Sequence, residues 1–212
     1  MRREIAYYDL ERGVSTLLDS QDAVFVRRLQ AGEDAAYDEL VRTYNASIYH
    51  VAYRMLGNSA DASDAVQDTF LKVFRNVEAF RGDSSLKTWI FRIGLSEILN
   101  RLRWWKRRHR LSTVSMDDDR NGNGRTLCVA DAAPSPHQSL ESKEQEVAIQ
   151  QALSRLSADH RSIVVLRDIE GFSYTEIADV LGISVGTVKS RLARARTDMK
   201  KSLIRFLSIP RV

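Results

Sequence analysis

The chain has 212 residues, 43% hydrophobic and 28% charged, a composition typical of a globular protein that buries a core. Its one cysteine, Cys128, excludes a disulfide framework and a cysteine-rich zinc site, and no apolar run is long enough to span a bilayer. The net charge of +4 is mild, so the distribution of charge is more informative than its sum. Only three prolines and ten glycines favour long helices, and we expect an all-α, cytoplasmic protein without membrane insertion.

Residues 1–21 show no sustained helical period and are expected to form a tail without a chemical role. Helical patterns then begin, and residues 22–108 are predicted to form the first of two small helical domains. Asp34 is expected to cap a long helix that ends at Gly57, and Asp61 to cap the next helix, which runs to about Val77.

One face of this last helix carries carboxylates, from Asp61, Asp64 and Asp68, with Leu71 among them. An exposed leucine between acidic side chains is a feature of partner surfaces. A solvated acidic face, favoured by the helix dipole, explains the first carboxylates equally well. The pattern by itself does not separate these two interpretations.

A loop at residues 80–85 precedes a long predicted helix over residues 86–108, in which aromatic and basic side chains alternate. The set consists of Trp89, Phe91, Trp104 and Trp105 among Lys87, Arg92, Arg101, Arg103, Lys106, Arg107, Arg108 and Arg110. Bases stack on aromatic rings and cations follow the phosphates, so the pattern favours single-stranded or opened nucleic acid. The alternative is that the tryptophans fill a helical core while the arginines extend to solvent, and for Trp89 alone we favour the core.

Residues 109–138 contain three consecutive aspartates, an Asn-Gly-Asn-Gly run and two prolines, without an apolar period. This composition predicts a flexible linker. A flexible chain of about 30 residues has a typical end-to-end distance of roughly 30 Å and stretches further, so two domains joined by it can hold separate stretches of one DNA.

Residues 139–208 are predicted to form a four-helix domain that ends in a helix-turn-helix. Ser173 and Glu176 have the spacing of a capping box, Gly182 supplies a left-handed helix end, and Ser184 caps the next helix. The small residue Ala178 permits a close crossing of the two helices.

The last helix has an apolar stripe on one side and small residues around Arg194 on the other, flanked by further cations. A helix that enters a major groove needs this layout, because small residues admit the backbone and cations hold the phosphates. A helical hairpin with a solvated basic face is the alternative. The cap, the glycine and the basic face together favour DNA binding.

These segments resemble the bacterial RNA polymerase sigma factors of the sigma-70 family, in the extracytoplasmic-function (ECF) group, over about residues 22–207. The resemblance rests on Arg161–Leu166, Glu170-Gly171, Glu176-Ile177-Ala178, Gly186–Arg196, Asp61-Ala62-x-Asp64-x-x-Gln67-Asp68-x-Phe70, Phe80-Arg81-Gly82 and Thr88–Ile93. Where the family often has Ile-Ala-x-Asn, this sequence has Ile93-Gly94-Leu95-Ser96, and Asn100 replaces an aspartate. Gly94 is expected to weaken its helix by roughly 1 kcal/mol relative to alanine.

The resemblance implies roles for three groups of residues, and it implies no cofactor, no metal and no catalytic activity. The expected contacts to the duplex minus-thirty-five element are Thr187, Lys189, Ser190, Arg191, Arg194 and Arg196. The expected contacts to the melted minus-ten element are Phe80, Arg81, Gly82, Asp83, Ser84, Lys87, Trp89 and Arg92. The expected polymerase-binding residues are Asp61, Asp64, Gln67, Asp68 and Leu71.

The partners that the resemblance implies are core RNA polymerase, through its β′ clamp helices and β flap, and promoter DNA in duplex and single-stranded form. An anti-sigma factor is common in this group, and nothing in the sequence identifies one. Two other readings stay open: a helix-turn-helix regulator that never joins polymerase, and a nuclease that uses Asp61, Asp64 and Asp68 with a divalent metal. The nuclease reading is weak, because no histidine or second carboxylate segment obviously converges on them.

Overall fold

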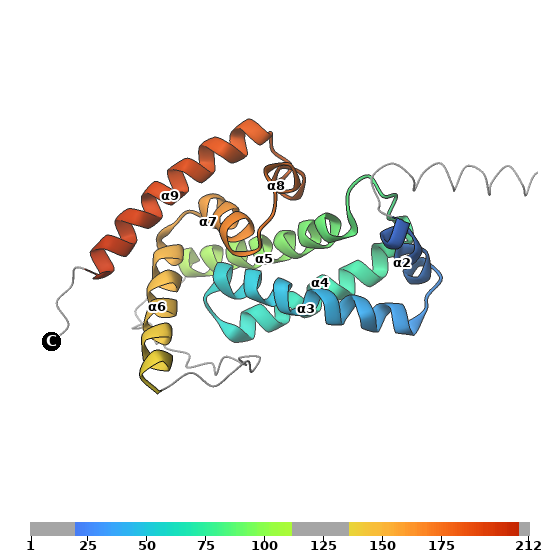
Figure 1. The fold of residues 1–212 in the computed structure, drawn as a ribbon, viewed down its shortest axis with the longest axis horizontal. Helices are drawn as coiled ribbons and strands as arrows, with labels where there is room; N and C mark the ends of the chain where they lie inside the picture. Colours follow the sequence, from blue (N-terminus) through green and yellow to red (C-terminus); the bar gives the residue numbers. More distant parts are fainter. Residues whose placement is uncertain (1–19, 112–135, 208–212) are drawn as a thin grey trace, which may run out of the picture.

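The computed structural model describes residues 20–111 and 136–207, and the regular structure in these ranges is helical throughout (Figure 1). The expectation of an all-α chain is therefore confirmed. The helices are α2 (Ser20–Gln30), α3 (Asp34–Leu56), α4 (Ser59–Asn76), α5 (Leu86–Leu111), α6 (Pro136–Arg155), α7 (Ala158–Val164), α8 (Tyr174–Leu181) and α9 (Val185–Leu207). Within the described ranges, none of these helices is long and apolar enough to cross a membrane.

The predicted tail and most of the predicted linker lie outside the described residues. Helix α5 continues to Leu111 and α6 already begins at Pro136, so the described helices reach into both ends of the predicted linker.

Helices α2 to α5 form what we call the N-terminal bundle, in which α3 packs on α4 and α5. The bundle core is aliphatic and aromatic, and its fully buried large side chains are Leu29, Leu40, Ile48, Met55, Leu86, Ile90, Phe91 and Ile98. The helical period of the sequence predicts three of these positions, Leu40, Ile48 and Met55, because apolar residues three and four apart share a helix face.

At the starts of α3 and α4, the residue at the N-cap position is not the one that the sequence predicted. Helix α4 is capped by Asn58, whose Oδ1 accepts a hydrogen bond from the backbone N–H of Asp61 at 3.1 Å. Asp61 therefore lies in the first turn instead of at the cap, where its charge still complements the helix dipole. Similarly, Asp34 is the first residue of α3, and Glu33 precedes it without a side-chain capping bond.

Gly94 lies where α5 crosses both α3 and α4. A Cβ atom added at this glycine would lie 3.3 Å from Cγ2 of Thr69 and 3.4 Å from Cδ1 of Ile48. These distances are tighter than ordinary carbon–carbon contact, so the glycine permits the close approach of three helices. The sequence alone indicated only a weakened helix at this position.

Helices α6 to α9 form the C-terminal bundle, in which α9 packs on α6, α7 and α8. Helix α7 continues into a π-helical turn at Val165–Ile169, and Ser157 caps α7 by accepting the N–H of His160. Apolar spacing over residues 142–156 predicts a helix whose inner stripe consists of Val147, Ala148, Ala152, Leu153 and Leu156. Four of these residues are buried, but Val147 has an exposed fraction of 51%, so the prediction is wrong for Val147. Helix α6 is longer at its start than the sequence indicated.

The two bundles contact each other directly. Helix α8 packs on α5, while α6 and α7 pack on α3 (Figure 1). Buried apolar residues of both bundles belong to one continuous cluster. No sequence pattern predicts this contact, because local patterns describe each helix separately.

Candidate nucleic-acid interface

The helix-turn-helix forms as its local signals predict. Ser173 accepts the N–H of Glu176, and the Glu176 carboxylate accepts the N–H of Ser173, which completes the capping box. Gly182 ends α8 with a φ of 64°, a left-handed conformation that suits glycine. Ser184 then accepts the N–H of Thr187 at 3.2 Å and caps α9.

Helix α9 presents a buried face and an exposed basic face. Val188, Leu192 and Ala195 are buried against the rest of the C-terminal bundle. Lys189 and Arg194 are exposed on other faces of the helix. This arrangement fixes the helix by its apolar side and leaves its cations accessible to an anionic partner.

The cations that flank Arg194 are held by neighbouring side chains. Arg196 forms an ion pair with Asp168 and donates hydrogen bonds to its carboxylate. The hydrogen bonds raise the pKa of Arg196. Arg191 Nη1 lies 3.2 Å from Oδ2 of Asp159. Among the described side chains, Arg194 has no ion pair of this kind, which leaves its guanidinium available.

The loop before α5 has a buried framework and an exposed rim. Phe80 and Ser84 are buried, and the Phe80 ring lies 5.0 Å from the half-buried Trp89 ring, centroid to centroid. Arg81 and Asp83 are exposed. Among the residues predicted to bind the minus-ten element, Phe80 and Ser84 thus shape the loop, and Arg81 and Asp83 are accessible.

Two further residues of the minus-ten set contact the C-terminal bundle. The ammonium group of Lys87 lies 4.2 Å from the ring centroid of Phe172. Arg92 donates a hydrogen bond from Nε to the carbonyl oxygen of Asp179 at 3.0 Å. Both cations therefore extend from α5 to residues of the C-terminal bundle.

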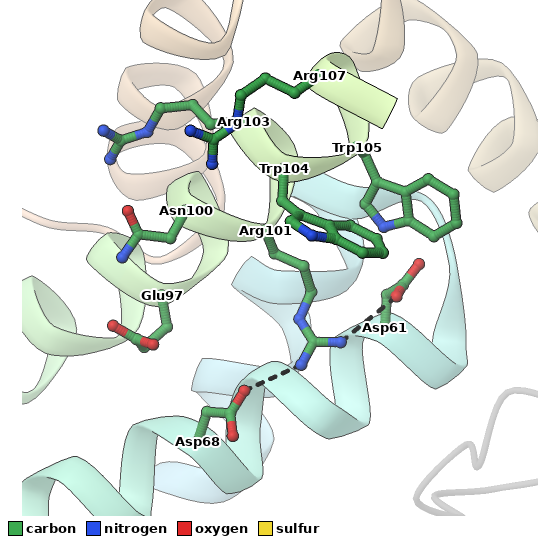
Figure 2. Close-up of a pocket in the computed structure, with 9 residues that line it drawn as sticks. All are labelled: Asp61, Asp68, Glu97, Asn100, Arg101, Arg103, Trp104, Trp105 and Arg107. Carbon is green, nitrogen blue, oxygen red and sulfur yellow. Dashed lines mark hydrogen bonds and ion pairs between the residues drawn. The ribbon is translucent and has the colours of Figure 1, made fainter. Parts of the chain in front are cut away.

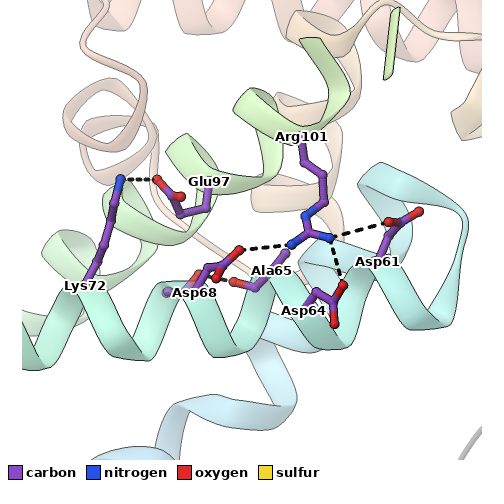
Figure 3. Close-up of polar contacts among 8 residues, drawn as sticks. Asp61, Asp64, Ala65, Asp68, Lys72, Glu97 and Arg101 are labelled. Atoms are coloured by element: carbon purple, nitrogen blue, oxygen red, sulfur yellow. Dashed lines mark hydrogen bonds and ion pairs between the residues drawn. The ribbon is translucent and has the colours of Figure 1, made fainter. Parts of the chain in front are cut away.

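The acidic face of α4 is paired with Arg101 of α5 (Figure 3). The Arg101 guanidinium lies 3.5 Å from Asp61, 3.0 Å from Asp64 and 2.9 Å from Asp68. Asp64, Gln67, Asp68 and Leu71 are exposed. The sequence grouped Arg101 with the nucleic-acid-binding cations, whereas the structure turns it towards the carboxylates.

A cavity of about 600 Å³ lies between the N-terminal half of α4 and the C-terminal half of α5 (Figure 2). Trp104 and Trp105 line it, with ring centroids 5.4 Å apart and their planes nearly perpendicular. Arg108 lies 4.6 Å from the centroid of the Trp104 ring. The sequence pattern predicted that this aromatic and basic segment binds nucleic acid. Of the residues that line the cavity, the sequence assigned only Asp61 and Asp68 to a specific site, the one for polymerase binding.

Within residues 20–111 and 136–207, no group of three or more histidine, cysteine or carboxylate side chains is arranged to hold a metal ion. The aspartates of α4 surround a guanidinium instead. This finding gives the nuclease reading no support.

Both bundles match known protein families. A family model described as Sigma-70 region 2 matches residues 40–109, and one described as Sigma-70, region 4 matches residues 146–199. The RNA polymerase sigma-H factor of Pseudomonas aeruginosa is 35% identical over 187 residues, which cover 88% of this chain and 96% of the relative. The ECF RNA polymerase sigma factor SigW of Bacillus subtilis is 32% identical over 181 residues, covering 84% and 94%.

Solved structures agree with these matches. The sigma factor RpoE of Bartonella quintana, solved in complex with the anti-sigma factor NepR, is 27% identical, with a TM-score of 0.61 over 79% of this chain and 96% of RpoE. CnrH, solved with the cytosolic domain of CnrY, shares the fold with a TM-score of 0.64 over 87% of this chain and 97% of CnrH, at 23% identity. The chain belongs to the sigma-70 family of RNA polymerase sigma factors, in its ECF group.

Proposed function

We propose that this sigma factor joins core RNA polymerase and directs it to promoters by reading two elements with two separate surfaces. The observation that carries the proposal is the exposed basic face of α9, which the helix-turn-helix holds by the buried side chains of Val188, Leu192 and Ala195. We assign residues 139–208 to minus-thirty-five recognition, residues 22–108 to polymerase binding and minus-ten recognition, and residues 109–138 to the linker.

In the C-terminal bundle, Arg194 is the base-reading candidate, because its guanidinium is exposed and matches the paired acceptors of a guanine edge. Lys189 and Arg191 lie to either side and would hold phosphates, as would Arg196. Thr187 and Ser190 are short polar residues that let the backbone approach the groove.

In the N-terminal bundle, the loop at residues 80–85 and the first turns of α5 form the proposed minus-ten surface. We assign the exposed Arg81 and Asp83 and the half-buried Trp89 to contacts with an unpaired base. Lys87 and Arg92 supply positive charge for the backbone of the melted strand. Unpairing a base costs a few kcal/mol, which contacts of this kind offset.

The exposed carboxylates of α4, with Leu71, form the proposed docking surface for the β′ clamp helices of polymerase. Leu71 has an exposed fraction of 43% beside Asp64 and Asp68, so the surface combines one apolar contact with negative charge. Such a surface fits a basic partner with an apolar patch. The C-terminal bundle would contact the β flap.

We also propose that the protein carries out no chemical reaction itself and acts in the cytoplasm, where chromosome and polymerase are. RpoE was solved with an anti-sigma factor. We include a regulator of that kind among the partners to be sought.

Transcription in vitro with purified core polymerase on genomic DNA tests the proposal, with mapping of the start sites. We expect activity that depends on this chain and is lost in the variant Asp64→Asn/Asp68→Asn. Asp38→Asn is the matched control, since Asp38 is an exposed carboxylate on α3 outside the proposed surface. If the purified chain binds DNA but forms no complex with core polymerase, it is an ordinary helix-turn-helix regulator and the proposal is wrong.

A further inference from the structure

The last residue of α2, Gln30, lies beside the segment that connects α4 to α5. Its side-chain amide donates hydrogen bonds to the carbonyl oxygens of Val77 at 3.2 Å and of Phe80 at 3.1 Å. The same Nε2 atom lies 3.5 Å from the carbonyl oxygen of Glu78. Gln30 and Phe80 are 50 positions apart in the sequence, so only the packing of α2 brings the amide to this segment.

The neighbours of the Gln30 amide nitrogen are all hydrogen-bond acceptors. An amide nitrogen carries two N–H groups, so the two closer carbonyls use both donors. Val77–Ala79 is a single 3-10 turn after α4, and carbonyls at the end of a helix have few donors within the helix. The Val77 carbonyl also accepts the N–H of Phe80 at 3.1 Å, so the amide of Gln30 completes the hydrogen bonding of this turn.

The hydrogen bond to the Phe80 carbonyl orients the residue that follows. Because the peptide group is planar, holding this oxygen also holds the N–H and the Cα atom of Arg81. Arg81 is exposed at the rim of the proposed minus-ten surface. On the inner side, the buried Phe80 ring lies 5.0 Å from the Trp89 ring, centroid to centroid. The position of Phe80 therefore affects both Arg81 and Trp89.

Helix α2 is itself held on the N-terminal bundle by contacts that do not involve the loop. Arg28 of α2 pairs with Glu39 of α3 at 3.0 Å. The hydroxyl group of Tyr37 in α3 donates to the carbonyl oxygen of Leu29 at 2.9 Å. The backbone of Gln30 thus has a position fixed by α3, and its side chain connects that position to the start of the loop.

We propose that Gln30 is a positioning residue for minus-ten recognition. Through its hydrogen bonds to the segment before the loop, it holds residues 80–85 in the geometry that presents Arg81 and Trp89 to an unpaired base. Gln30 precedes residues 40–109, which the Sigma-70 region 2 model matches, so this role adds α2 to the recognition unit. The role in recognition rests on the proposed function, whereas the fixing of the loop by Gln30 does not.

Two replacements of Gln30 separate hydrogen bonding from packing. Gln30→Met is unbranched and of similar length but has no donor. Gln30→Lys is also unbranched and keeps N–H donors, which the three carbonyls can accept. Arg28→Met is the matched control on α2, because it removes the ion pairs to Glu33 and Glu39 and leaves the contacts of the loop in place.

The first readout is the fluorescence of Trp89 in the free full chain. Trp104→Phe/Trp105→Phe, introduced into every chain for this measurement, leaves Trp89 as the only tryptophan. Acrylamide quenches a tryptophan more strongly when its surroundings open to solvent. We expect a larger quenching constant in Gln30→Met than in the parent, and values close to the parent in Gln30→Lys and Arg28→Met.

The second readout uses holoenzyme assembled from core polymerase and chains with their tryptophans unchanged. The probes are a short single strand that carries the minus-ten element found by start-site mapping, and its single-base variants. We expect Gln30→Met to lower the preference for the matched strand about 3- to 10-fold, because apparent affinity falls with the fraction of loops in the binding geometry. Affinities for core polymerase and for a duplex minus-thirty-five element should stay unchanged.

Equal quenching in the parent and in Gln30→Met would overturn the fixing of the loop, and equal effects of Gln30→Met and Gln30→Lys would overturn the role of the hydrogen bonds. Increased quenching with an unchanged minus-ten preference would overturn the positioning role, as would a parallel fall in affinity for core polymerase. If the parent chain forms no holoenzyme, the proposed function fails, while the quenching result still decides whether Gln30 fixes the loop.

Discussion

Arg101 of α5 donates a hydrogen bond from Nη2 to Oδ2 of Asp68 in α4 at 2.9 Å, and Asp64 accepts a second bond from the same guanidinium at 3.0 Å. Burial alone lowers the pKa of Arg101, but the hydrogen bonds to Asp68 and Asp64 outweigh it and raise the pKa above its usual value. Arg101 thus joins α5 to α4 and offsets the electrostatic repulsion among Asp61, Asp64 and Asp68.

We expect Arg101→Ala to lower the free energy of unfolding by at most about 1 kcal/mol at low salt, because partly exposed ion pairs contribute little. The difference from wild type should shrink at about 1 M salt, where screening reduces both attraction and repulsion. Urea denaturation at the two salt concentrations measures it, with Arg103→Ala as the control. Arg103 donates only to the carbonyl of Leu99 among the described contacts. Equal destabilisation by both variants would contradict the role of Arg101.

Arg194 and Lys189 are predicted to have different effects on promoter binding. Arg194→Ala should cost about 1–3 kcal/mol at one base position of the minus-thirty-five element and relax the preference there. Lys189→Ala should weaken binding to all sequences alike and reduce the salt dependence. Binding to a library of selected elements and their single-base variants, measured at two salt concentrations, separates the effects. Unchanged selectivity in Arg194→Ala would show that another residue reads the base.

Gly182→Ala tests the turn of the helix-turn-helix. The φ of 64° disfavours alanine, although a Cβ there would meet no atom within 4 Å, so the cost comes from the backbone alone. We expect a loss of about 1–2 kcal/mol in the free energy of unfolding. Gly186→Ala is the contrast, because Gly186 lies inside α9, where alanine is the better helix former. Thermal unfolding that ranks the two variants in the opposite order would contradict this account.

Glu170 is predicted to make stability depend on pH. Burial raises the pKa of Glu170 above its ordinary value of 4.5, although the charges of His50 and Lys87 and a hydrogen bond with Ser47 oppose the shift. A carboxyl with a raised pKa in the folded state contributes stability that is fully present below pH 4.5 and lost as pH rises through the raised value. Glu170→Gln should therefore be more stable than wild type at neutral pH.

The advantage of Glu170→Gln should disappear as the pH falls below about 4.5, the ordinary pKa of this carboxyl. Urea denaturation of both proteins across this range gives the measurement. Glu146→Gln is the control, because Glu146 pairs with Arg54 at the same contact between the bundles. A constant difference between wild type and Glu170→Gln at every pH would show that titration of Glu170 is not the cause.

The sequence alone determined the local features of this protein. Ser173, Glu176 and Gly182 define the turn of the helix-turn-helix, because a capping box and a left-handed glycine act over only a few residues. The exposed basic face of α9 and the acidic face of α4 follow from helical spacing in the same way. These local patterns, with the matching motifs, were sufficient to assign the family.

Only the tertiary structure decided how distant residues meet. Arg101 turned from the basic helix to the carboxylates of α4, Phe80 became part of a buried framework, and Gly94 proved to be a point of close approach. The pairing of Phe91 with Phe172 joins segments that no local pattern relates. Helical periodicity states which face of each helix is buried, but the partner of that face depends on the packing of the whole chain.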